Sequence, residues 1–227
     1  MNFINHDERS IDMNELCENS VNKNVRDFYI EAIELPIVYN KYGDHDPNGL
    51  LYVLQKDAQR IKERAVENFN KEVPQPYEEV RPLVLRANLG DEIRVHFKHS
   101  LGRNLSIHVQ GLAYDVKCSD GSFVGMNPDS TTASEIVYYW YAQKEGVYLF
   151  SDLGDARSSE EGTNIHGLFG AIIIEPPEST WLDPETGGVL ESGLFADIYH
   201  PINPAFREYA VFFHDELEIK NKEESNP

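Results

Sequence analysis

Short runs of β-branched and aromatic residues, separated by turns, dominate the chain from residue 83 onward. They lie at Leu83–Arg86, Glu92–Phe97, Leu105–Val109, Glu135–Tyr141, Gly146–Phe150 and Phe169–Ile174. Turn sequences such as Leu89-Gly90-Asp91 and Ser119-Asp120-Gly121 separate them. An earlier strand is predicted at Arg26–Leu35, where Pro36 stops it. Several short strands at close spacing indicate a mostly β fold, a sandwich or a barrel.

One amphipathic helix is predicted at about residues 51–70. Its apolar residues recur at steps of three and four between Leu54 and Phe69, and its other face is charged. This pattern is typical of a surface helix that lies on an apolar support. Pro74 and Pro76 follow it and prevent its continuation.

The sequence divides into three segments. Residues 1–24 are polar and are expected to form an N-terminal arm, residues 25–178 the β domain, and residues 179–227 a linker with one extra strand. That strand is predicted at Arg207–His214. It is either the opening strand of a further domain or the last strand of this one.

Charge and composition exclude several classes of partner. The chain has 39 acidic and 20 basic residues, a net charge of −19, so nucleic acid and anionic membrane surfaces are not expected partners. No apolar run reaches membrane-spanning length, and Met1–Ser20 has no apolar core typical of a signal peptide. Cys17 and Cys118 are the only cysteines and are expected to be free thiols. A cytoplasmic or cell-internal location follows as the expectation.

Five stretches together resemble the multicopper oxidase family over roughly residues 25–214. They are Gly90–Phe97, Ser106–Gly111, Tyr138–Asp152, His166–Pro176 and Asp183–Glu208. The last stretch is similar to the linker that precedes a second cupredoxin domain in large bacterial members of the manganese-oxidising, ceruloplasmin-like type. The resemblance implies a cupredoxin-like Greek-key β-sandwich with the 51–70 helix as a surface insertion.

The resemblance also implies where copper ligands should lie. Family members hold a trinuclear copper centre with His-x-His pairs. Here the first pair reads His108-Val109-Gln110 and the second reads Phe150-Ser151-Asp152, so His108 alone is kept. Imidazole suits copper, whereas carboxylate and amide oxygens are poorer donors. A blue-copper site is not expected, because no histidine and methionine follow Cys118 at the required spacing.

His108, His166 and Asp152 are therefore the candidate metal ligands, for at most a partial copper site; no cofactor at all is the equal alternative. Two functions follow. The chain is either a cupredoxin-like module of a multicopper oxidase that is catalytically incomplete alone, or a free-standing structural or oligomerising protein without copper chemistry. Its expected partners are other cupredoxin domains of a parent oxidase or copies of itself.

Overall fold

The computed structural model describes residues 24–122, 135–154, 162–215, 217 and 219–221. It is mostly β, as predicted. The strands are β1 Val25–Glu34, β2 Ile37–Val38, β3 His45–Asp46, β4 Leu50–Leu54, β5 Leu83–Asn88, β6 Glu92–His99, β7 His108–Val109, β8 Ala113–Tyr114, β9 Glu135–Tyr141, β10 Gly146–Ser151, β11 Phe169–Glu175, β12 Thr180–Leu182, β13 Phe195–Tyr199 and β14 Phe206–Tyr209. The helices are α2 Ala58–Phe69 and α3 Val116–Ser119. Neither helix is long and apolar enough to cross a membrane, in the part of the chain described.

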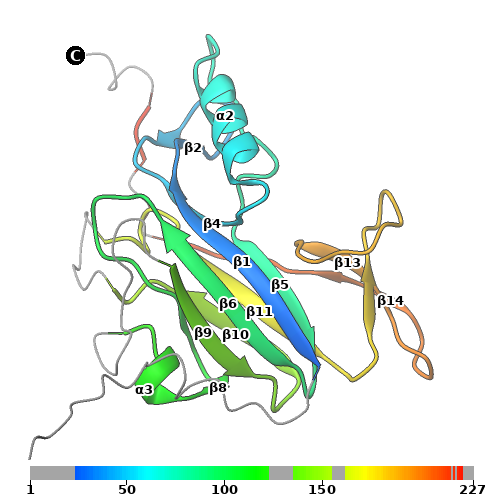
Figure 1. Cartoon of the computed structure of the whole chain (residues 1–227). Helices are drawn as coiled ribbons and strands as arrows, with labels where there is room; N and C mark the ends of the chain where they lie inside the picture. The colour runs from blue at the N-terminus through cyan, green and yellow to red at the C-terminus, as the bar shows by residue number, and fades with distance from the viewer. Residues whose placement is uncertain (1–23, 123–134, 155–161, 216, 218, 222–227) are drawn as a thin grey trace, which may run out of the picture.

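Two sheets form a sandwich (Figure 1). One has the strand order β4-β1-β6-β9-β8 and the other the order β5-β11-β10-β7. Most neighbouring strands are antiparallel, but β1 pairs in parallel with β6, and β5 with β11. Parallel neighbours require long crossover connections, so each sheet combines strands from distant parts of the chain. The predicted β-sandwich is confirmed.

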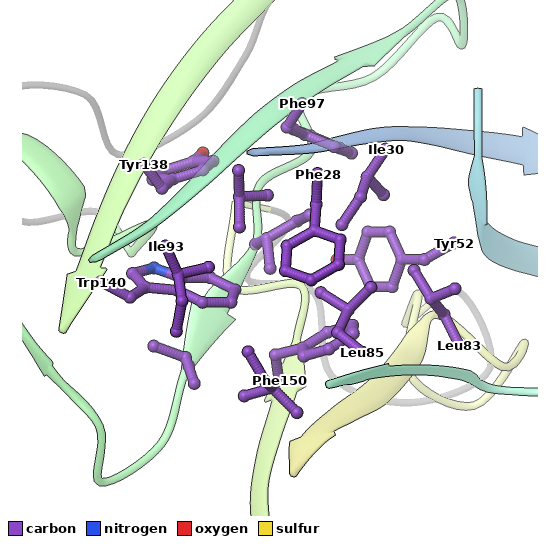
Figure 2. Close-up of a cluster of buried hydrophobic side chains, with 14 of the residues drawn as sticks. Phe28, Ile30, Tyr52, Leu83, Leu85, Ile93, Phe97, Tyr138, Trp140 and Phe150 are labelled. Carbon is purple, nitrogen blue, oxygen red and sulfur yellow. The ribbon is translucent and has the colours of Figure 1, made fainter. Parts of the chain in front are cut away.

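The core lies between the sheets and is rich in aromatic side chains. Phe28, Tyr52, Trp140 and Phe150 are each at most 1% exposed and gather in one cluster (Figure 2). The rings of Phe97 and Phe150 both meet Tyr52 edge-on, with centroids 5.8 and 5.7 Å away. Such edge-to-face pairs add to the free energy gained by burial. The alternation of the strands therefore places every second side chain in this cluster.

The predicted helix begins later than expected. Residues Leu50–Leu54 form strand β4, and the helix α2 starts at Ala58. All five residues of β4 are buried: Tyr52 faces the main core, whereas Leu51 and Val53 pack under α2. A strand buried on both faces has no polar alternation, so it resembles the apolar start of a helix in sequence. The surface helix itself is confirmed over the remaining residues, and Figure 1 shows it lying over β4.

The C-terminal residues form a third sheet with the order β12-β13-β14. Trp181, Ala196 and Ile198 make its small core. The predicted strand Arg207–His214 is paired only at its beginning, as β14, and residues 210–215 continue without regular secondary structure. This sheet joins the sandwich through Gly193, whose amide donates to the carbonyl of Val84 at 3.1 Å.

Candidate functional site

His108 lies in the short strand β7, opposite Ser151 of β10. Its Nδ1 is 2.6 Å from the backbone carbonyl oxygen of Asp120 and 3.4 Å from the Asp120 carboxylate. A carbonyl oxygen can only accept, so Nδ1 carries the proton, and in the neutral ring Nε2 presents its lone pair. Among the described residues, none hydrogen-bonds Nε2. The ring is thus held in the tautomer that a metal-ligating histidine requires.

The turn at Asp120 holds His108 in this position. Tyr114 packs edge-on against the imidazole, and its hydroxyl lies 3.4 Å from the Asp120 carboxylate. Burial, together with the charge of Asp120, raises the pKa of Tyr114, which keeps this hydroxyl protonated. Gly121 follows with φ of +73°, and a Cβ there would lie 2.2 Å from the carbonyl oxygen of Ile107. Only glycine fits so close to the strand before His108.

His166 has a different partner. Its Nδ1 lies 2.6 Å from Oδ2 of Asp46, and both side chains are almost fully buried. Asp46 also accepts from the amide of Asn48 at 2.8 Å. Burial, with the charge of the nearby Asp46 as the second cause, raises the pKa of Tyr39 to about 12. His166 therefore joins the loop before β11 to the β2–β3 hairpin.

Asp152 follows strand β10 and is 1% exposed. Its Oδ1 accepts from the amides of Ser106 at 2.8 Å and Gly154 at 2.9 Å, and its Oδ2 from the hydroxyl of Thr163 at 2.6 Å. The buried hydroxyl of Tyr52 donates to the Ser106 carbonyl at 2.6 Å. Burial is the main cause, and the Asp152 charge the second, of a pKa well above the ordinary value for Tyr52. The carboxylate thus serves as a hydrogen-bond acceptor for the protein interior.

The three candidate ligands do not converge on one point. Over the described ranges, no group of three or more His, Cys, Asp and Glu side chains could hold a metal ion. His108 is fixed by Asp120, His166 by Asp46, and Asp152 by several donors from its surroundings. Phe150, at a position where the resemblance places a histidine, is fully buried beside Tyr52 and Trp140 (Figure 2). The residues present therefore do not fit a multinuclear copper centre.

Two residues of this region were not predicted as functional. Asp120 stood only in a turn sequence, although it orients His108, and Asp46 was not singled out, although it binds His166. The glycine after Asp120 was the available signal, because a glycine with positive φ marks a close backbone approach.

Cys118 differs from its expectation. It lies in α3 and is disulfide-bonded, not a free thiol. The other cysteine of the sequence, Cys17, lies outside the described residues.

The sequence matches one family of known proteins. A family model described as multicopper oxidase matches residues 55–179, which is more than half of the chain. A search of curated protein sequences finds no significant match.

Several solved structures are similar to this chain. A multicopper oxidase from Pseudomonas thermotolerans is 19% identical with a TM-score of 0.48, and the match covers 69% of this chain and 31% of that one. A copper nitrite reductase from Nitrosomonas europaea is 15% identical with a TM-score of 0.45, covering 68% and 43%. A multicopper oxidase from Campylobacter jejuni, described as a metallo-oxidase, is 20% identical with a TM-score of 0.44, covering 71% and 28%. The chain thus spans less than half the length of each of these structures.

Proposed function

Because the chain belongs to the multicopper oxidase family, we propose that it is a cupredoxin-like module that has kept the scaffold of the family and lost its own catalytic copper centre. In this role it packs beside other domains instead of carrying out oxidation itself. Its partners are other cupredoxin domains of a longer oxidase or further copies of itself. The oxidation of a substrate coupled to reduction of oxygen belongs to the parent protein in this proposal.

The packing of Phe150 and Asp152 carries the proposal. The resemblance places copper-ligating histidines at both positions, but Phe150 is built into the aromatic core and Asp152 is occupied by interior donors. Replacing either residue by a ligand would disturb the fold. Loss of the second His-x-His pair is therefore tied to the stability of this sandwich.

Of the first His-x-His pair, His108 still has a geometry that suits a metal ligand. Its protonated Nδ1 is fixed by the Asp120 carbonyl, and its side chain is 18% exposed. One imidazole does not make a copper site, since copper sites in proteins use several nitrogen or sulfur donors. We propose that His108 at most completes a site whose other ligands come from a neighbouring domain.

The subtype of the parent oxidase is also a proposal. The stretch Asp183–Glu208, which resembles the linker of large bacterial, manganese-oxidising, ceruloplasmin-like members, supports it. In this chain the stretch runs from the end of β12 into β14.

Copper content is the first test of the proposed function. The purified chain is loaded with copper, desalted, and measured by mass spectrometry beside His108→Ala and the control His200→Ala. We expect well below one copper per chain in all three proteins, because the ligand set is incomplete. Nearly one copper per chain that is lost in His108→Ala but kept in His200→Ala would contradict the proposal and assign a copper site to this domain.

For location we propose the interior of the cell, because two cysteines in 227 residues do not make the dense disulfide framework of small secreted domains. The disulfide at Cys118 argues in the other direction, since such bonds persist in oxidising compartments. Fractionation of cells that produce the chain decides between them. Recovery of the chain with a cytoplasmic marker is expected, and recovery from the medium or another oxidising compartment refutes this location.

A further inference from the structure

Residues 210–215 form an exposed segment after β14. Side chains along it alternate between half-buried and exposed, as in an extended strand. Phe212 and His214 face inward and contact Phe169, with ring centroids 5.9 and 5.0 Å away. Val211 is 69% exposed and Phe213 is 96% exposed. Both side chains lie on the outer side of the segment, and exposed apolar side chains gathered in one patch are typical of surfaces that bind other proteins.

The backbone of residues 211–215 is unpaired with respect to the described part of the chain. The amide of Ala210 donates to the carbonyl of Leu194 at 2.8 Å, and beyond it no backbone hydrogen bond joins residues 211–215 to any other described residue. From β14 the chain continues along the sandwich until Lys220 bridges to His45 of β3 (Figure 1). An extended segment with free backbone groups is a template on which another chain can pair.

An apolar hollow of about 540 Å³ lies directly beside the segment. Ile37, Tyr39, Tyr77, Val80 and Phe169 line it, and Val211 and Phe212 of the segment form one wall. This volume falls within the range of pockets that hold ligands or anchor side chains, which is roughly 300–1,000 Å³. An aromatic side chain fits the size and the chemistry of the hollow.

Two charged residues lie beside the hollow and the exposed aromatic side chain. Arg81 lines the hollow, and its guanidinium makes no hydrogen bond or ion pair to any described residue. Asp215 is exposed and lies two residues after Phe213, hence on the same side of the extended segment. One surface thus carries the exposed Phe213 with Asp215 near it. Beside them lies the apolar hollow with Arg81 in its lining.

We propose that this surface joins two copies of the chain about a two-fold axis. An interface of this symmetry uses the same patch on both copies, so the patch must be complementary to itself. Phe213 of each copy enters the hollow of the other, Asp215 approaches Arg81 across the interface, and the unpaired backbones of residues 211–215 come alongside. The inference rests on the packing role proposed above and names its face and its partner.

Sedimentation velocity of the metal-free chain over a range of concentrations tests the proposal. We expect a reversible equilibrium between the 25.9 kDa chain and its dimer. Phe213→Asp should weaken association by at least about 30-fold, the effect of losing a central aromatic anchor. Because Phe213 is exposed in the monomer, its replacement should leave the far-ultraviolet circular dichroism unchanged.

Charge reversal gives the sharper control. Arg81→Asp and Asp215→Arg should each weaken the dimer, and the double variant should recover most of the loss. Val189→Asp removes an apolar residue that is 84% exposed but lies outside this surface, and it should leave association unchanged.

A chain that stays monomeric up to about 1 mM would overturn the proposal and leave the hollow to a different domain. A dimer that Phe213→Asp does not weaken would overturn it as well. Both results come from sedimentation and do not depend on copper content. A failure of the proposed dimer is therefore distinct from a failure of the proposed function.

Discussion

At the scale of single residues, the carboxylate of Asp152 holds three chain segments together. It accepts hydrogen bonds from Ser106 before β7, from Gly154 after β10, and from Thr163 in the loop that leads to β11. The Ser106 hydroxyl also lies 3.2 Å from Oδ1 and accepts from the amide of Leu153 at 3.1 Å. A buried carboxylate with this many donors organises the loops at one end of the sandwich.

Asp152→Ala is expected to destabilise the fold strongly. It leaves two buried amides and two buried hydroxyls, those of Ser106 and Thr163, without their acceptor, and each orphaned donor costs about 1–3 kcal/mol. We expect a loss of roughly 3 kcal/mol in the free energy of unfolding by urea denaturation, with Glu185→Ala as an exposed control near zero. A loss below about 1 kcal/mol would mean that water accepts these hydrogen bonds in place of the carboxylate.

The candidate residues could be read from the sequence, but their partners could not. His108, His166 and Asp152 were singled out by motif. The residue that fixes His108 lies 12 positions away across a turn, and the one that fixes His166 lies 120 positions away. Contacts of this range depend on how loops fold back on the sandwich, which local patterns do not encode.

At the scale of elements, a buried arginine fastens the C-terminal sheet to the sandwich. Arg86 of β5 is fully buried, and its Nη1 lies 2.6 Å from Glu208 of β14 and 3.9 Å from Glu175 of β11. Its Nη2 donates to the carbonyl of Gly193 at 3.2 Å. Burial raises the pKa of Glu175 to about 7, with the negative charge of Glu208 as the second cause. Three strands from two sheets therefore share one charged cluster.

This cluster makes stability depend on pH. The folded state holds a proton on Glu175 that the unfolded state, with an ordinary pKa of 4.5, has already released. The contribution of protonated Glu175 to the free energy of unfolding is fully present below about pH 4.5 and is lost as the pH rises through about 7. Glu175→Gln should remove this decline, which reaches up to about 3 kcal/mol in the free energy of unfolding.

Denaturant titrations at pH 5 and pH 8 measure the effect. Glu185→Gln, an exposed control, should keep the decline of the unmodified chain. Parallel pH curves for the unmodified chain and Glu175→Gln would show that Glu175 is not the titrating group.

The elements themselves were largely predictable. Strand β9 has the bounds that its aromatic run suggested, and β6, β10 and β11 differ by one or two residues. The miss at β4 has a physical cause, because Leu51 and Val53 are covered by α2 and Tyr52 by the core, so the polar alternation of an ordinary strand is missing. The strand expected at Arg207–His214 was cut short because only its first residues find a neighbouring strand.

At the scale of the whole molecule, composition and pattern indicated a β-sandwich, and the structure has one with a third sheet attached. The main core draws its side chains from residues between Phe28 and Ile174. The C-terminal sheet has its own small cluster around Trp181 and was expected only as a linker with one strand. Its strands are short, so their hydrophobic alternation is a weak signal in the sequence. The sheet is attached to β5 by a contact between residues that are distant in the sequence.

The position of β11 has a consequence for how the chain is made. It is the last strand of the sandwich to be synthesised, yet it lies between β5 and β10 in its sheet. A nascent chain therefore presents Leu83 and Leu85 to the cell with no strand beside them until Glu175 has left the ribosome. Folding must wait for late, distant pairing, which is slow and favours aggregation. A chaperone that holds β5 until Glu175 has emerged would therefore protect this protein during synthesis.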